Sequence, residues 1–202
     1  MTEATRDRLI TAAMSLFAER GARGTTIGDI EEDAGLTRRG GAFYKHFHSK
    51  EEILEAGIER EIREAEAVRG VVELLPLGEL RAELTLICRL LLAQLTRQRD
   101  LTRVFEKEGE KIAELRDRML KRVIQVDYRQ AAQVAQGWVK EYGIEDVDVE
   151  AVVTMMLGAI VNYRRTEWTF GGAPLDVDEN RFVEAWVDGC ARLLEALSPA
   201  KP

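Results

Sequence analysis

The sequence predicts an all-α fold, and three observations support this class. Only 4 Pro and 16 Gly occur among the 202 residues, so the chain has few of the turn residues that many short strands would need. Apolar residues recur at helical spacing over most of the chain. The content of 46% hydrophobic and 32% charged residues is that of a globular chain that can bury a core.

The first predicted helix covers residues 3–20. Leu9, Ala13, Leu16 and Phe17 are spaced i, i+4, i+7 and i+8, which places them on one face. Gly21 follows at the position where a left-handed residue commonly ends a helix. A second, shorter helix is predicted next, with Thr25 or Thr26 as its N-cap, Ile27, Ile30 and Ala34 as its apolar stripe, and Gly35 as its end.

Residues 36–47 form a third segment that is rich in Arg, Lys, Gly and aromatic side chains. Ser49 and Glu52 then have the spacing of a capping box, which predicts the start of a fourth helix. Two short helices separated by a glycine are typical of a helix-turn-helix motif. On pattern alone, a buried helical hairpin with no role in DNA binding would look similar.

The charge distribution is uneven along the chain. The formal net charge is −7, but residues 1–50 hold eight Lys and Arg against seven acids, a local net charge of +1. The remaining residues carry a net charge of −8. The acidic average therefore does not exclude DNA binding by the first 50 residues.

Residues 9–54 resemble the DNA-binding domain of the TetR/AcrR family of transcriptional repressors. The spacing "AA…LF…G…TT…I…AG…FY.HF.SKE.L" is met here by Ala12-Ala13, Leu16-Phe17, Gly21, Thr25-Thr26, Ile30, Ala34-Gly35, Phe43-Tyr44, His46-Phe47, Ser49-Lys50-Glu51 and Leu54. The resemblance implies an all-α protein, with a three-helix helix-turn-helix DNA-binding domain in residues 1–50. It further implies a helical ligand-binding and dimerisation domain in residues 51–202.

The segment after Ala34-Gly35 departs from the commoner family form. It has twelve residues where that form has ten, and the extra two lie within residues 37–41. Because adjacent glycines disfavour a helix interior, we expect the recognition helix to start at Gly40 or Gly41, with Arg38 and Arg39 on the preceding turn.

Each candidate DNA contact has a chemical reason. Arg38 and Arg39 can donate bidentate hydrogen bonds to guanine, or can simply attract phosphate. Hydroxyl and ammonium groups suit phosphate, and bare glycine amides can approach it closely. Lys50 matches a family position that commonly meets the DNA backbone. The expected DNA-binding set is Thr26, Thr37, Arg38, Arg39, Gly40, Gly41, Tyr44, Lys45, His46 and Lys50.

The rest of the chain reads as helices with few breakers, and residues 149–168 are expected to form a central buried helix. The resemblance implies that the last two helices form a homodimer, which suits a near-palindromic operator. Arg164 or Arg165, just after the apolar run, could anchor an anionic ligand or form a salt bridge at the subunit interface. The expected ligand-binding set, whose members could equally be ordinary core, is Phe105, Met119, Tyr128, Trp138, Met155, Met156, Tyr163, Arg164 and Trp168.

Other function classes find little support. Ser occurs only at positions 15, 49 and 198, and the only histidines, His46 and His48, lie in the DNA motif, so we expect no catalytic or metal site and no cofactor. The longest uncharged stretch has 13 residues, whereas a membrane span needs about 20. Two Cys without a CxxC motif fit the cytoplasm. We expect a repressor released by a small apolar molecule; the alternatives are a regulator without a ligand and a helical ligand-binding or scaffold protein.

Overall fold

The structure, a computed structural model, describes residues 2–72 and 78–198, and it confirms the all-α class. Every regular element in these residues is a helix. The described residues form two compact units. The first unit comprises the residues up to Glu66 together with Arg97–Val123, and the second comprises the described residues of Ala67–Thr96 and those from Ile124 onward.

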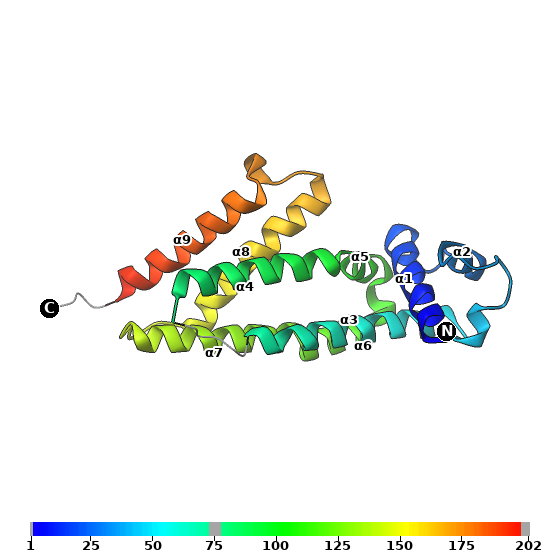
Figure 1. Cartoon of the computed structure of the whole chain (residues 1–202), viewed down its shortest axis with the longest axis horizontal. Helices are drawn as coiled ribbons and strands as arrows, with labels where there is room; N and C mark the ends of the chain where they lie inside the picture. Colours follow the sequence, from blue (N-terminus) through cyan, green and yellow to red (C-terminus); the bar gives the residue numbers. More distant parts are fainter. Residues whose placement is uncertain (1, 73–77, 199–202) are drawn as a thin grey trace. The chain divides into compact units, whose positions relative to one another are not determined.

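The first unit contains the N-terminal helices and a later group of short ones (Figure 1). The helix predicted over residues 3–20 is observed as α1, and the helix opened by Ser49 is observed as α3. Two elements, α3 and the π-helical turn η3, also contribute residues to the second unit. The elements are α1 (Thr2–Arg20), α2 (Ile27–Asp33), the 3-10 turn η1 (Phe43–Lys45), α3 (Lys50–Val72), α5 (Arg99–Glu108), the 3-10 turn η2 (Gly109–Ile112), α6 (Ala113–Met119) and η3 (Leu120–Ile124).

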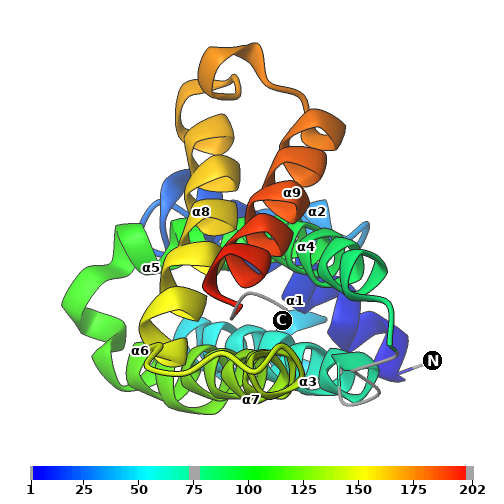
Figure 2. The same ribbon diagram turned by 90° about the vertical axis from the view of Figure 1, so that its left-hand side faces the viewer.

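The second unit is built from four long helices (Figure 2). Figure 2 shows that α8 and α9 run in opposite directions and are joined by the loop that contains η4. The elements are α4 (Leu80–Arg97, of which the last residue belongs to the first unit), α7 (Gln125–Glu141), α8 (Val149–Phe170), the 3-10 turn η4 (Pro174–Asp176) and α9 (Glu179–Leu197).

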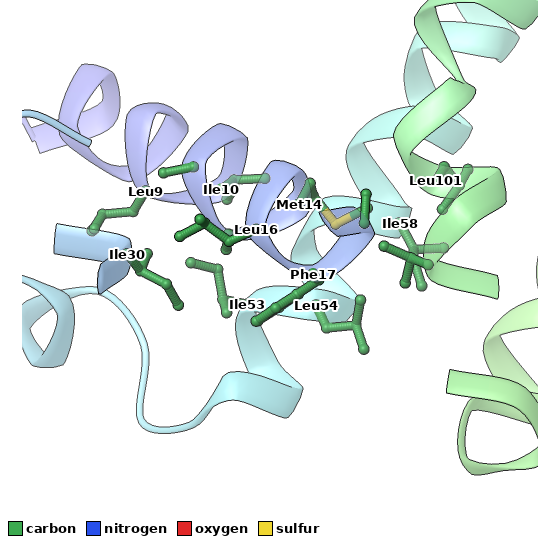
Figure 3. Packing of buried hydrophobic residues seen from close by; sticks show 14 of the residues in the cluster. Leu9, Ile10, Met14, Leu16, Phe17, Ile30, Ile53, Leu54, Ile58 and Leu101 are labelled. Carbon is green, nitrogen blue, oxygen red and sulfur yellow. The ribbon is translucent and has the colours of Figure 1, made fainter. Parts of the chain in front are cut away.

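Helix α1 lies at the centre of the core of the first unit (Figure 3). The face predicted from Leu9, Ala13, Leu16 and Phe17 is buried, and burial extends to neighbouring positions because α5 also packs against α1. A Cβ added at Gly57 would lie 2.5 Å from the Met14 sulfur, so only glycine lets α3 approach α1 this closely. The core side chains from the other helices include Ile30, Ile53, Ile58, Leu101 and Val104.

The caps of this unit follow the sequence prediction closely. Gly21 adopts φ 76° after α1, and its N–H donates to the backbone oxygen of Phe17 at 2.9 Å. Thr26, rather than Thr25, caps α2: its hydroxyl accepts from the N–H of Asp29, whose carboxylate accepts from the N–H of Thr26. At α3 the hydroxyl of Ser49 accepts from the N–H of Glu52 at 3.1 Å.

A buried acid joins two helices of the second unit. Glu83 of α4 is 1% exposed, and its Oε2 accepts from the indole Nε1 of Trp138 at 2.8 Å. Its Oε1 accepts from the backbone N–H groups of Gly78 and Glu79 at the start of α4. Because buried carboxylates are stable only when they accept hydrogen bonds, Glu83 ties Trp138 to the beginning of α4.

Helix α8 is not buried all round, so the expectation of a central buried helix is wrong. One face, which includes Leu157 and Ile160, packs into the core of this unit. The other face is open, and Met155 is 60% exposed. The physical reason is that α4, α7 and α9 of the same chain cover only part of this apolar helix. Within the described ranges 2–72 and 78–198, the length and apolarity that a membrane span requires are not met by any helix.

The capping box of α2 gives a first prediction. We expect Thr26→Ala to lower the free energy of unfolding by about 1 kcal/mol, because the substitution removes the acceptor for the N–H of Asp29. Urea unfolding followed by circular dichroism measures this change. Thr169→Ala, at an exposed position in the last turn of α8, is the control and should change stability by less than about 0.5 kcal/mol.

Asp29 adds a dependence on pH to the same cap. The backbone N–H of Thr26, then its hydroxyl, and more weakly Arg38 and Arg20, hold the pKa of Asp29 below its ordinary value of 3.8. A lowered carboxyl pKa stabilises the folded state above the ordinary value, and the effect is lost as pH falls through the folded pKa. The stability difference between the wild type and Asp29→Asn should therefore shrink below about pH 4. A constant difference at lower pH would contradict this account.

Candidate DNA-binding surface and ligand pocket

The start of α2 gathers three of the residues expected to contact DNA. Thr26 caps the helix, and the carboxylate of Asp29 accepts from both the backbone N–H of Thr26 and Nη2 of Arg38, each at 2.9 Å. The Nζ of Lys50 donates to two backbone oxygens of the loop before α2, at 2.6 and 3.0 Å. Thr26, Arg38 and Lys50 therefore lie around one helix end, held by contacts within the first unit.

Residues 37–47, which we name the recognition segment, do not form the helix expected to start at Gly40 or Gly41. The regular structure in this segment is the 3-10 turn η1 alone, and φ is 59° at Arg39 and 75° at Gly41. These left-handed values interrupt any α-helical path, so this expectation is wrong. Gly40 and Gly41 favour the observed tight turns over a helix, because they carry no side chain that resists such turns.

The side chains of the recognition segment divide into a buried and an exposed group. Phe43 and Phe47 are buried in the core of the first unit. Tyr44 is 59% exposed, while Gly41 and His46 are half-buried. Among the described residues, the side chains of Arg39 and Lys45 make no hydrogen bond or ion pair. The exposed residues are Thr37, Arg38, Arg39, Gly40, Tyr44 and Lys45.

Arg38 differs from Arg39 because acids of α2 hold it. Its Nη1 lies 2.7 Å from Oε2 of Glu32, and its Nη2 lies 2.9 Å from Oδ1 of Asp29. Glu31 is 1% exposed, and its Oε1 accepts from the backbone N–H of Phe43 at 3.0 Å. Reasoning from the sequence missed Asp29, Glu31 and Glu32; their signal was a group of acids on a short helix that precedes a basic segment.

The second unit contains an apolar pocket with a cavity volume of about 80 Å³, which is partly open to solvent. Its walls come from α4, α7, α8 and α9 together with Val147, and no wall residue is charged. The indole N–H groups of Trp138 and Trp186 are already used by Glu83 and by the backbone oxygen of Met156. Burial raises the pKa of Cys190, which also lines the pocket, to about 12, so this thiol stays neutral.

The residues expected to bind a ligand are distributed over several places. Trp138 and Met156 line the pocket, together with residues that the sequence did not single out, such as Ile87, Ala135, Val152 and Leu193. Phe105 and Met119 pack in the first unit. Met155 is exposed, Trp168 is half-buried, and Tyr128 borders a shallow depression with Ile124 and Arg129.

Two further candidates stabilise the connection between α8 and α9. The hydroxyl of Tyr163 donates to the backbone oxygen of Val177 at 2.9 Å, and its ring stacks on Phe182. Arg164 is 8% exposed and donates to Glu167 and Glu179, at 2.7 and 2.5 Å. Its charge is therefore balanced within the chain.

Comparison with known proteins places these features in a family. Residues 9–56 match the model of "Bacterial regulatory proteins, tetR family". The "Probable HTH-type transcriptional regulator ArpR" of Pseudomonas putida is 31% identical over 97% of this chain and 93% of its own length. This chain therefore belongs to the TetR family, whose members are transcriptional regulators that bind operator DNA and typically form homodimers.

Two other relatives differ in how much of the chain they match. The "HTH-type transcriptional repressor KstR2" of Mycolicibacterium smegmatis is 44% identical over 50 residues, which is 25% of this chain and 23% of that protein. The crystal structure of a "gamma-butyrolactone receptor (ArpA like protein)" superposes with a TM-score of 0.60 at 25% identity, covering 96% of this chain and 98% of the other. The N-terminal segment is thus the part shared most strongly, while the helical C-terminal part is shared in fold.

The position of Lys50 gives a second prediction. We expect Lys50→Ala to lower the free energy of unfolding by about 1 to 2 kcal/mol, because its ammonium group is the donor for two loop carbonyls. Lys45→Ala is the matched control: it removes one cation from an exposed side chain and should change stability by less than about 0.5 kcal/mol. Chemical denaturation of both variants provides the test. Equal stability of the two would show that the Lys50 contacts contribute nothing.

Proposed function

We propose that this protein is a repressor that binds a near-palindromic operator as a homodimer and is released when a small apolar molecule occupies the pocket of its second unit. The observation that carries the proposal is that pocket, with uncharged walls and a cavity volume of about 80 Å³, in a chain of a DNA-binding family. In this proposal residues 1–50 contact DNA, and residues 51–202 bind the ligand and form the dimer.

The DNA-binding part of the proposal rests on the exposed side chains of the recognition segment. Arg39 is exposed and has no partner among the described residues, so its guanidinium can make a bidentate contact with guanine. Tyr44 and Lys45 are exposed and can contact phosphate. Thr26, Thr37 and the half-buried His46 remain candidates for backbone contacts. In a two-fold dimer, two such surfaces would meet half-sites about 34 Å apart or at a multiple of that distance.

The dimer part rests on the open faces of α8 and α9. The exposed stripe of α8 contains the uncharged residues Ala151, Met155, Ala159 and Asn162 and continues to Arg165. On α9 the exposed stripe contains the small residues Ala185, Gly189 and Ala196 together with Arg181 and Arg192. Small residues allow helices to approach closely, and the apolar part of the α8 face that its own chain leaves open favours burial against a second copy. These faces support pairing as a four-helix bundle.

The ligand part rests on the chemistry of the pocket walls. An anion would lose its hydration there without gaining a positive charge or a free N–H donor, which is costly. Arg164, the candidate anchor for an anionic ligand, is instead paired with two acids. The pocket therefore favours a neutral, mainly apolar molecule. Regulation by a small molecule is also consistent with the name of the structural relative, which is a receptor for gamma-butyrolactone.

The third prediction separates base contacts from phosphate contacts. After an operator has been selected from random duplex DNA, Arg39→Ala should weaken its binding about 10- to 100-fold and relax specificity at one position. Lys45→Ala should weaken operator and scrambled duplex alike and lower the salt slope by about one unit. Fluorescence anisotropy at several salt concentrations measures both effects. If Arg39→Ala weakened both duplexes equally, Arg39 would be a phosphate contact only.

The fourth prediction concerns the ligand, with 1-decanol and decanoate as probes of equal chain length. In a Trp168→Phe background, Trp138 and Trp186 are the remaining tryptophans, and both line the pocket. We expect 1-decanol to change their fluorescence with an affinity at least about tenfold higher than that of decanoate, because the uncharged walls cannot stabilise a carboxylate. The same alcohol should weaken operator binding by the wild type.

A matched pair of variants identifies the site of this effect. Ala135 lines the pocket, whereas Gln136 is exposed on the same helix. Ala135→Phe should abolish the response to 1-decanol, and Gln136→Phe should retain it. Operator binding that is unaffected by any neutral ligand would favour a DNA-binding regulator without an inducer. Ligand binding without operator selectivity would favour a helical ligand-binding or scaffold protein.

A further inference from the structure

The recognition segment is attached to α2 at two places. Near its start, Arg38 bridges Asp29 and Glu32 at 2.9 and 2.7 Å. In its middle, at the beginning of η1, the buried carboxylate of Glu31 accepts from the backbone N–H of Phe43 at 3.0 Å. Three acids in four consecutive positions of one helix therefore contact a single segment.

The surface of α2 is shaped for this contact. Gly28 is buried, and a Cβ added there would lie 3.1 Å from Cγ and 3.2 Å from Nε of Arg38. The side chain of Arg38 therefore lies across the first turn of α2. A larger residue in place of Gly28 would crowd it. Helix α2 is itself held firmly, because Ile30 is completely buried in the core of the first unit (Figure 3).

The part of the recognition segment before η1 has little internal structure that could orient it. Its described backbone bonding consists of a single turn, in which the N–H of Gly40 donates to the backbone oxygen of Thr37 at 2.8 Å. Arg39 and Gly41 have left-handed φ values, which no helical hydrogen bonding supports. Its orientation must therefore come from contacts with α2 and from the buried phenylalanine rings.

We propose that Arg38 is a positioning residue, which together with the acids of α2 sets the orientation in which the recognition segment meets DNA. This inference rests on the proposed function and assigns separate roles to two adjacent arginines. Arg38 holds the segment through Glu32 and Asp29, and Arg39 makes the sequence-specific contact. Glu31 fixes the middle of the segment through the backbone of Phe43.

Simple electrostatics makes the opposite prediction for Glu32. An exposed acid close to DNA repels phosphate, so its removal should tighten binding to any duplex. If Glu32 instead holds Arg38, its removal should weaken operator binding while nonspecific binding still improves. Asp33 is the natural control, because it is an exposed acid next to Glu32 and has no partner among the described residues.

The experiment compares Glu32→Gln with Asp33→Asn, using the selected operator and a scrambled duplex in fluorescence anisotropy. We expect Asp33→Asn to tighten both complexes by a similar factor. Glu32→Gln should tighten the scrambled complex to the same extent but weaken the operator complex about fivefold to tenfold. Arg38→Lys, which keeps the charge but cannot bridge two carboxylates in a planar fork, should also lose operator affinity selectively.

Amide hydrogen exchange in the protein without DNA provides a second readout. Glu32→Gln should speed exchange in residues 38–43, and Asp33→Asn should not. One outcome would overturn the positioning role and leave the proposed function standing. In that outcome the wild type prefers the operator, and Glu32→Gln tightens the operator complex as much as Asp33→Asn does. If the wild type binds both duplexes equally, the proposed function fails and this inference fails with it.

Discussion

The first unit depends on the burial of α1 on more than one side. Its apolar side chains pack against α2 and α3, and also against α5, which comes about 80 residues later in the chain. Two polar contacts join the end of α1 to α5: Glu108 accepts from the N–H of Ala22 at 2.7 Å, and Lys107 donates to the backbone oxygen of Glu19 at 2.8 Å. Residues 1–50 therefore share their core with α5 and do not bury their apolar side chains alone.

In the proposed function, ligand binding would affect DNA binding through the chain connection from α4 to α5. Leu84 and Ile87 of α4 line the pocket, and α5 begins at Arg99, two residues after α4 ends. In the proposed function, a ligand that prefers one arrangement of α4 would shift the population of arrangements available to α5 and α1. A ligand preference of about 3 kcal/mol would correspond to a change of roughly a hundredfold in operator affinity.

The acidic character of the chain has a structural explanation in both units. In the first unit, Glu55 and Glu59 of α3 pair with Arg118, while Asp29 and Glu32 pair with Arg38. In the second unit, Glu83 is buried against Trp138. Many acids thus serve internal contacts and leave the exposed bases of the recognition segment available, which is why a net charge of −7 is compatible with membership of a DNA-binding family.

The sequence by itself determined the all-α class, the extent of α1, the caps at Gly21 and Ser49, and the resemblance to the family, while it left the cap of α2 open between Thr25 and Thr26. These features depend on residues within a few positions of one another, where helical periodicity and capping chemistry act directly. The tertiary structure decided the backbone path of the recognition segment, the ion pairs of Arg38 with the acids of α2, and which residues line the pocket. The bond between Glu83 and Trp138 spans 55 positions, and Phe105 packs in a different unit from Trp138. Contacts of this range depend on how whole helices pack, which local spacing does not encode.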